Sequence, residues 1–197
     1  MPRWEPDAPA RLQQAALALY AEHGYDRTTA ADIAQHAGLN RRTFFRHFSD
    51  KREAVFWGSE ILEQRVLAAI ETADEQATPL EMILTGLRAG APLFQDRRQA
   101  VLQRRLVIDA TPELQERERT KLAHLVETIT DALCAKGVEC HAASIAGQTA
   151  TTILHIAFVA WADPANEQSM IERIDQAVIQ LKTLVSQPSC EPSRARP

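Results

Sequence analysis

The sequence predicts an all-α protein in which a small three-helix head is followed by a helical body, with about nine helices in total. Apolar residues recur at spacings of three and four, the pattern of a helix face, and no segment shows the alternation of a strand. Helix-starting pairs such as Thr78-Pro79 and Thr111-Pro112, and turn residues such as Gly38, separate these segments. With 197 residues and 45% hydrophobic content, the chain can bury a large core.

The first helix runs from about Ala8 to Glu22 and ends at Gly24. Residues 1–7 contain two prolines and no helical periodicity, so we expect a loose arm there. With two further helices the first one forms the head, whose predicted core is Leu12, Ala16, Ile33, Leu39, Phe44 and Phe48.

A helix-turn-helix follows the first helix. Thr29 is a suitable cap for a short helix, which stops at Gly38, a residue that readily adopts the positive φ of a tight turn. Asn40 caps a second helix, in which Phe44 and Phe48 lie four residues apart on one face and point into the head. The opposite face of this second helix is free.

That free face is cationic. It carries Arg41, Arg42, Phe45 and Arg46, with Thr43 and His47 on its flank. A short helix that is apolar behind and cationic in front fits the major groove of DNA, where arginine binds guanine bidentately or neutralises phosphates. The alternative is a solvated charged surface, the usual fate of exposed arginines. The position of these arginines, just after a glycine turn between two capped helices, favours DNA binding.

The body is predicted from similar signals. Asp50 and Glu53 fit a capping box that starts a long helix to about Ala73, continuous with the head and able to act as a lever. Further helices are predicted over residues 78–90, 96–110, 111–137, 141–161 and 166–187. We expect a DNA-binding domain at residues 1–50, a helical body at 51–187 and a disordered tail at 188–197.

The last two helices have the pattern of a subunit interface. Apolar residues of the final helix recur at spacings of three and four, and the preceding helix is rich in small residues that allow close approach. Core packing within one chain is the alternative. Dimerisation is favoured because two recognition helices about 34 Å apart read a palindrome. The predicted interface is Ile153, Ala157, Ile171, Ile174, Val178, Leu181 and Val185.

Charge is unevenly distributed along the chain. The net charge is −4, but residues 1–52 hold eight Lys and Arg against six Asp and Glu, a balance of +2, and the remainder holds fourteen against twenty, a balance of −6. An acidic body with a mildly basic head suits a protein that approaches DNA by one end. The negative total argues against an indiscriminate, histone-like binder.

Compartment signals point to the cytoplasm. The N-terminus lacks the basic and apolar regions of a signal peptide, and the longest uninterrupted apolar stretch, Thr151 to Ala162, is too short to span a bilayer. The cysteines give neither a zinc signature nor a disulfide framework, so we expect reduced thiols at Cys134, Cys140 and Cys190.

The order T-T-x-x-D-I-A-x-x-A-G, then L-N-x-x-T-F-F-x-H-F and S-D-K-R-E, resembles the TetR family of dimeric bacterial transcriptional repressors over the first quarter of the chain. The resemblance implies that Thr29 and Lys51 bind phosphates. The family commonly has tyrosine at position 45, so we expect the ring of Phe45 to pack on a sugar or a thymine methyl instead. The predicted DNA contacts are Thr29, Asn40, Arg41, Arg42, Thr43, Phe45, Arg46, His47 and Lys51.

The resemblance also implies an effector pocket in the body, whose occupation moves the head. The run RRLVIDATPELQERERTKLAHL further resembles a subset of actinobacterial regulators that bind acyl-CoA-like ligands. Each polar candidate has a simpler alternative, for instance arginines that pair with nearby acids. The candidate pocket residues are Phe56, Trp57, Ile61, Arg65, Leu87, Phe94, Arg104, Arg105, His124, Leu125, Gln148 and Thr152.

Catalytic chemistry has no sequence support. We find no glycine-rich phosphate loop, nucleophile elbow or HExxH motif, and predict neither a metal nor a cofactor. His36 and Asp32 lie four residues apart on a surface helix, where a solvated role is favoured over catalysis. We therefore expect a homodimeric repressor released from a palindromic operator by a small, largely apolar effector. The alternatives are an effector-independent architectural DNA binder and, less favoured, a helical small-molecule enzyme.

Overall fold

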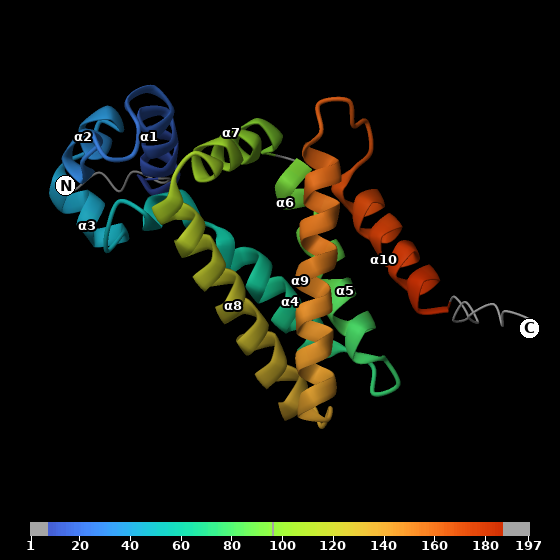
Figure 1. The fold of residues 1–197 in the computed structure, drawn as a ribbon. Helices are drawn as coiled ribbons and strands as arrows, with labels where there is room; N and C mark the ends of the chain where they lie inside the picture. The colour runs from blue at the N-terminus through green and yellow to red at the C-terminus, as the bar shows by residue number, and fades with distance from the viewer. Residues whose placement is uncertain (1–7, 96, 187–197) are drawn as a thin grey trace, which may run out of the picture.

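The computed structural model describes residues 8–95 and 97–186, and its fold is shown in Figure 1. The described residues form ten α-helices and one 3₁₀ helix without any strand, so the all-α prediction is confirmed. One of the ten, α6 (Pro92–Gln95), is a four-residue piece that the sequence did not indicate. The predicted arm at residues 1–7 and the predicted tail at 188–197 lie outside the described residues.

The head consists of α1 (Ala8–His23), α2 (Ala30–His36) and α3 (Arg41–His47), which lie together at one end of the molecule (Figure 1). Its predicted core is confirmed, because all six residues belong to one hydrophobic cluster. Leu39 is partly buried, and the buried members are Leu12, Ala16, Ile33, Phe44 and Phe48.

The long lever helix predicted from Asp50 to Ala73 is wrong. The chain instead forms a short 3₁₀ helix, η1 (Glu53–Phe56), turns at Gly58, whose φ is +88°, and only then enters α4 (Ser59–Thr72). A left-handed backbone at this point suits glycine and interrupts a right-handed helix.

The break has a packing reason. Ala54, Val55 and Phe56 are consecutive, and all three are buried in the head cluster. A continuous α-helix would spread three consecutive side chains around its axis and expose part of them. Gln13 of α1 fastens the broken segment, since its Nε2 donates to the carbonyl oxygens of Val55 at 3.1 Å and Trp57 at 3.0 Å.

The body contains, besides α4 and α6, the helices α5 (Pro79–Gly90), α7 (Arg98–Asp109), α8 (Pro112–Ala135), α9 (Cys140–Ala162) and α10 (Met170–Ser186). α9 packs against α5, α8 and α10, and Figure 1 shows α8 running from the head to the far end of the body. α7 lies against α1, so the body touches the head through α7 as well as through α8.

Two hydrophobic clusters hold the fold together. One fills the body between α4, α5, α8, α9 and α10. The other is the head cluster, which continues beyond residue 50 through η1 and also takes in Val107, Ile108 and Leu114 from α7 and α8. Packing therefore crosses the predicted domain boundary, and the head rests on α7 and on the start of α8.

α9 is more apolar than the sequence prediction allowed. It is 23 residues long with a mean hydropathy of 1.3 in its best window, enough by length and composition to cross a membrane. The same properties are common in the central helix of a helical core, and α9 packs against three neighbouring helices. Its position in the body cluster explains part of this composition, because 39% of that window is buried within the chain.

Candidate nucleic-acid interface and effector region

The start of α2 is held by a reciprocal cap. The backbone N–H of Asp32 donates to Oγ1 of Thr29 at 3.2 Å, while the carboxylate of Asp32 accepts from the backbone N–H and the hydroxyl of Thr29 at 2.8 and 2.7 Å. These hydrogen bonds from Thr29 lower the pKa of Asp32. The expected cap is confirmed, and the contact of Thr29 with phosphate stays a prediction.

The turn between α2 and α3 sets the position of the recognition helix. Gly38 has a φ of +67°, and its N–H donates to the carbonyl of Gln35 at 2.9 Å. Leu39 N–H donates to the carbonyl of Ala34 at 2.8 Å, and the guanidinium of Arg11 donates to the carbonyl of Ala37. The carbonyls at the end of α2 are thus satisfied, and the chain leaves in a fixed direction.

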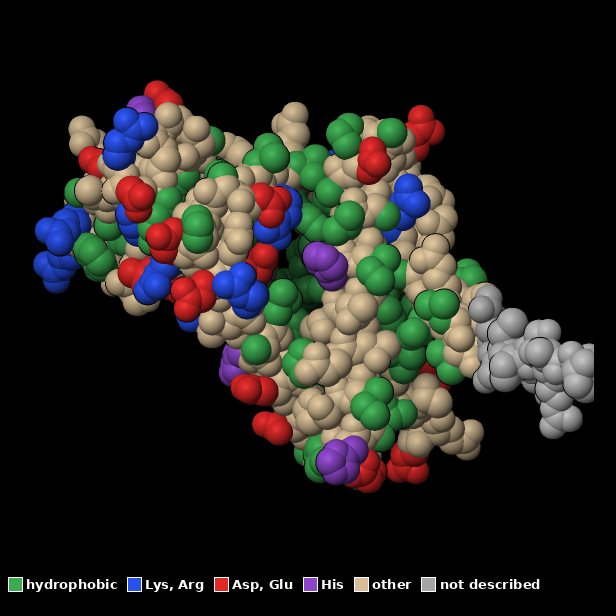
Figure 2. Space-filling model, viewed as in Figure 1, with side chains coloured by type: hydrophobic (Ala, Val, Ile, Leu, Met, Phe, Trp, Pro, Cys, Tyr) green, Lys and Arg blue, Asp and Glu red, His purple; other side chains and the backbone are tan. Residues whose placement is uncertain are grey.

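α3 is buried on one side and exposed on the other. Oδ1 of Asn40 accepts the N–H of Thr43 at 2.8 Å, which caps the helix as predicted. Phe44 is fully buried and packs 5.6 Å from the ring of Phe48. The exposed side chains are Arg41, Arg42, Phe45, Arg46 and His47, and Figure 2 shows basic side chains gathered at this end of the head.

Phe45 is an exposed aromatic ring on this cationic face. It is 47% exposed, its ring meets Phe44 edge-on at 5.3 Å, and the guanidinium of Arg41 lies 5.3 Å from its centroid. A surface recess of about 570 Å³ is lined by Asn40, Arg42, Thr43, Phe45 and Arg46. Most of the predicted DNA contacts are therefore brought together on one helix.

The surroundings of His47 favour its neutral imidazole form. Partial burial and the neighbouring charge of Arg46 lower the pKa of His47 below its ordinary value. Its Nε2 lies 3.4 Å from Nη2 of Arg46. The side chain can thus serve as a hydrogen-bonding group in the interface.

Lys51 has a structural role that the sequence did not indicate. Its ammonium donates to the carbonyls of Tyr25 and Thr28 at 2.7 and 3.0 Å and lies 3.9 Å from the centroid of the Tyr25 ring. The hydroxyl of Tyr20 donates to the Lys51 carbonyl at 2.7 Å. Lys51 therefore fastens the α1–α2 loop to the chain after α3, and phosphate contact by its remaining donor stays a prediction.

The residues predicted for an effector pocket are dispersed. Leu87, Leu125 and Phe94 belong to the body cluster, with Phe94 partly buried, whereas Phe56 and the partly buried Trp57 belong to the head cluster. The guanidinium of Arg65, on the outside of α4, donates to the carbonyl of Ala89. The remaining exposed candidates are Ile61, His124, Gln148 and Thr152. Figure 2 shows the face hollowed between α8 and α9, with hydrophobic side chains inside the hollow.

Arg104 and Arg105 join the body to the head. Nε of Arg104 donates to the Val55 carbonyl at 3.0 Å, and its guanidinium lies 5.0 Å from the centroid of the Phe56 ring. Arg105 pairs with Glu118 at 2.8 Å and with Asp109. Both side chains are engaged within the protein, which is the simpler alternative to effector binding.

Glu53 completes this head–body joint. Its carboxylate pairs with Nε of Arg117 at 2.6 Å and with the ammonium of Lys121 at 3.2 Å, both from α8. Burial alone would raise the pKa of Glu53, but these two partners outweigh it and the pKa is lowered. The sequence offered no signal for these pairs, because the partners are more than sixty residues apart.

The predicted dimer interface needs correction. Ile153, Ala157, Ile174 and Val178 are buried inside the single chain, Leu181 is partly buried, and only Ile171 and Val185 are exposed. The seam of α10 packs against α9 of the same chain. The large apolar side chains that these two helices do expose are Ile145, Ile156, Val159, Ile171, Ile179, Leu184 and Val185. Gln148 and Thr152 lie on this same outward face of α9 by helical spacing.

The thiol of Cys134 is held in its protonated form. A hydrogen bond with Cys140, followed by burial, raises the pKa of Cys134 to about 11. Both residues are free cysteines, and a thiol with so high a pKa is protonated at neutral pH. Cys190 lies outside the described residues.

Comparisons with known proteins agree with this geometry. The family model for bacterial regulatory proteins of the tetR family matches residues 12–55. TcmR of Streptomyces glaucescens, an HTH-type transcriptional regulator, is 34% identical over 79 residues, which are 40% of this chain and 35% of TcmR. MftR of Mycobacterium tuberculosis, whose name links it to the regulation of mycofactocin biosynthesis, is 31% identical over 125 residues, 61% of each protein. The chain thus spans less than two thirds of either relative.

A solved structure extends the likeness to the whole fold. SmeT, the repressor of a multidrug efflux pump of Stenotrophomonas maltophilia, was solved in complex with triclosan. That complex matches with a TM-score of 0.56 at 19% identity, over 96% of this chain and 99% of SmeT. The family model matches the head, whose capped helix-turn-helix resembles that of the tetR family of bacterial regulatory proteins, and the helical fold of the whole chain is shared with SmeT.

Proposed function

We propose that this protein is a sequence-specific DNA-binding transcriptional regulator, a repressor that binds a palindromic operator as a homodimer and is released by a small, largely apolar effector. The observation that carries the proposal is the exposed face of α3. It presents three arginines and no acid on a helix whose opposite face is buried through Phe44. Such a helix fits the major groove, where arginine can read guanine.

The interface divides into two kinds of contact. Arg42, Thr43 and Phe45 surround the recess on α3 and are the base-reading candidates. Thr29, at the start of α2, and Lys51, with one ammonium donor left after its two carbonyl contacts, are phosphate-binding candidates. The phosphate contacts position the head, and the base contacts select the sequence.

Dimerisation is assigned to the outward faces of α9 and α10. In the described part of the chain, seven of the eleven large apolar side chains that are exposed lie on these two helices. An apolar surface of this kind marks an interaction site in a globular protein. Two-fold pairing across it would present two copies of α3 to one operator.

The effector site is assigned to the hollow between α8 and α9, whose interior is apolar (Figure 2). SmeT, which has the same fold, holds a small molecule in its triclosan complex. The acyl-CoA-like ligand implied by the resemblance of residues 104–125 has an apolar acyl chain that would suit this hollow, and it stays a prediction. Effector binding would act on the head through the joint, where Arg104 contacts the Val55 carbonyl.

Two other classes remain as alternatives, an architectural DNA binder without effector and an enzyme. The first would bind a palindromic site and random duplex with similar affinity. Catalysis at Asp32 and His36 is disfavoured because the carboxylate of Asp32 is engaged by Thr29. We propose a non-catalytic protein that divides into a DNA-binding head at residues 1–50 and an effector-binding and dimerisation body at 51–187, and that acts in the cytoplasm.

Replacing Arg42 by alanine tests base reading. Loss of a bidentate arginine–guanine contact costs about 1–3 kcal/mol. Arg42→Ala should therefore weaken binding to an operator, selected from random duplex, by at least about fivefold, and weaken binding to random duplex much less. Arg119→Ala, an exposed arginine on α8, is the control. Fluorescence anisotropy at one salt concentration gives both affinities. Equal losses on all sequences would show that Arg42 contacts only phosphates.

Replacing thymine by uracil tests Phe45. The exchange removes only the 5-methyl group, the one apolar atom that bases present in the major groove. At one thymine in each half-site of the selected operator, replacement by uracil should weaken binding of the wild-type protein. The same replacement should leave binding of the Phe45→Ala protein unchanged. A wild-type protein insensitive to every uracil exchange would assign the ring to a sugar contact instead.

Charging the apolar face of α9 and α10 tests the dimer. Ile179 is 62% exposed, so Ile179→Glu should leave the protomer folded and yield monomers, because a carboxylate buried at the interface would be unpaired. Leu106→Glu, at a residue 71% exposed on α7, is the matched control and should stay dimeric. Sedimentation equilibrium measures both masses. An Ile179→Glu protein as dimeric as wild type would place the interface elsewhere.

A further inference from the structure

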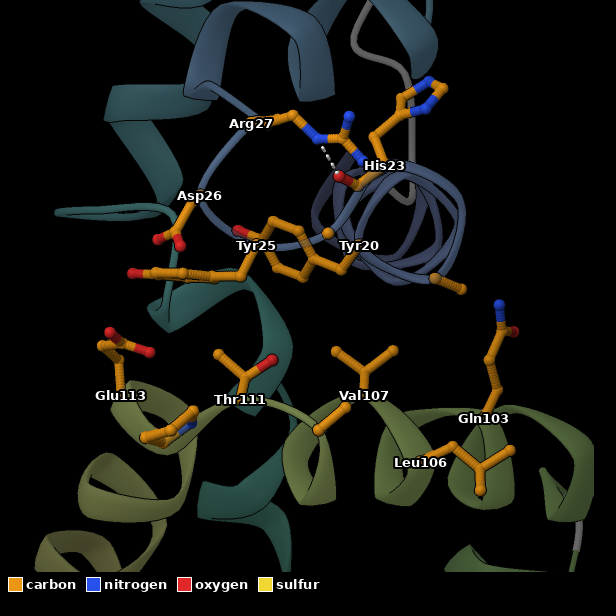
Figure 3. Close-up of a pocket in the computed structure, with 14 residues that line it drawn as sticks. Tyr20, His23, Tyr25, Asp26, Arg27, Gln103, Leu106, Val107, Thr111 and Glu113 are labelled. Atoms are coloured by element: carbon orange, nitrogen blue, oxygen red, sulfur yellow. Dashed lines mark hydrogen bonds between the residues drawn. The ribbon is translucent and has the colours of Figure 1, made fainter.

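Two cysteines lie on either side of the turn between α8 and α9. Cys134 belongs to the last turn of α8, and Cys140 is the first residue of α9. A hydrogen bond joins their side chains, so the two sulfur atoms are neighbours. The pair lies outside the surfaces assigned above to DNA binding and dimerisation. It also lies outside the cleft of about 600 Å³ that Tyr25 and Val107 line between the head and the body (Figure 3).

The turn itself holds the two residues in place. Gly137 ends α8 with a φ of +88°, and its N–H donates to the carbonyl of Cys134 at 2.9 Å. The carboxylate of Glu139 accepts the backbone N–H groups of His141 and Ala142 at 3.0 and 2.9 Å, which caps the start of α9. Because both helix ends are fixed by these bonds, the two thiols stay close without any rearrangement of the rest of the chain.

The two thiols have different surroundings. Cys140 is exposed, whereas Cys134 is partly buried and packs against the body cluster. The hydrogen bond with Cys140 is the main reason why the pKa of Cys134 is raised, and burial and the charge of a Cys140 thiolate follow. A thiolate is the reactive form of cysteine, so Cys134 is protected while Cys140 keeps its free sulfur. Oxidation of the Cys140 sulfur removes that charge and that thiol–thiol bond.

We propose that Cys134 and Cys140 are a hydroperoxide-sensitive pair that closes to a disulfide. The sulfur of Cys140 attacks one oxygen of the hydroperoxide, the O–O bond breaks, and the other oxygen leaves as water or an alcohol with the thiol proton. The product at Cys140 is a sulfenic acid. The sulfur of Cys134 then attacks the sulfenic sulfur, the S–O bond breaks, and hydroxide leaves as water with the Cys134 proton. Two thiols are thus oxidised by two electrons, and one hydroperoxide is reduced.

Proximity makes the disulfide the favoured product. Only five residues separate the two cysteines, so the sulfenic acid meets Cys134 at a high effective concentration, before a second hydroperoxide or another thiol arrives. The bond ties α8 to α9 at their common end, which is remote from the head (Figure 1). An effect on the effector response rests on the proposed hollow between these helices, whereas formation of the disulfide does not.

The test treats the reduced, full-length protein with hydrogen peroxide, blocks the remaining thiols with N-ethylmaleimide and maps tryptic peptides by mass spectrometry without reductant. Lys136 lies between the two cysteines, so trypsin separates residues 122–136 from residues 137–173 unless a disulfide joins them. The joined pair should be the main oxidation product, and dithiothreitol should separate it. Cys190→Ser is the matched control and should give the same product, because it removes only the third cysteine.

Two single variants test the order of the steps. In Cys134→Ser, dimedone should label Cys140 as a trapped sulfenic acid, and in Cys140→Ser, Cys134 should stay available to N-ethylmaleimide. The reverse labelling would overturn the order. Disulfides that join Cys140 to Cys190 or to a second molecule as the main product, or a doubly oxidised Cys140 beside a free Cys134, would overturn the pairing itself, as would no oxidation at all. Because neither DNA nor effector is present, none of these outcomes bears on the regulator function.

Discussion

One backbone carbonyl, that of Val55, receives a hydrogen bond from the head and another from the body. Gln13 of α1 donates to it at 3.1 Å, and Arg104 of α7 donates to it at 3.0 Å. The next residue, Phe56, is buried in the head cluster with the guanidinium of Arg104 5.0 Å and the ammonium of Lys121 5.8 Å from its ring centroid. The chain after α3 is thus held from both sides, and the position of α3 relative to the body follows from it.

The magnitudes separate the roles of these contacts. Burying an aromatic side chain such as Phe56 contributes about 1.5–3 kcal/mol, whereas a partly exposed ion pair such as Glu53–Arg117 contributes about 0–1 kcal/mol. The burial of Phe56 therefore holds the head–body joint together, and the ion pairs orient it. Coupling between a ligand and DNA is typically about 1–3 kcal/mol, so displacing Arg104 from the Val55 carbonyl is a change of sufficient size.

The head could be predicted from the sequence because its signals are local. Thr29, Gly38 and Asn40 act within three or four residues of themselves, and the structure has the caps and the turn at those positions. Phe44 and Phe48 show which side of α3 is buried, so the exposed cationic face followed directly. The overall helical class followed from periodicity, which any long amphipathic segment reveals.

The joint could not be predicted in this way, because its partners are distant in the chain. Arg104 lies forty-nine residues from Val55, and the residues around Arg104 give no indication that its side chain binds the Val55 carbonyl. The periodicity predicted an apolar face on α10, but it does not distinguish a face that packs within the chain from one that packs against a second subunit. Ile174 and Val178 of this face pack within their own chain. The apolar spacing predicted one helix through Gly58, whereas the positive φ of Gly58 separates η1 from α4.

The most direct test of this account is differential scanning calorimetry of the wild-type protein. If the head and the body share the joint at Val55 and Phe56, they cannot unfold independently, and we expect one cooperative transition whose van't Hoff enthalpy, taken per cooperative unit, equals the calorimetric enthalpy. Two separate transitions, with the head melting while the body stays folded, would contradict it.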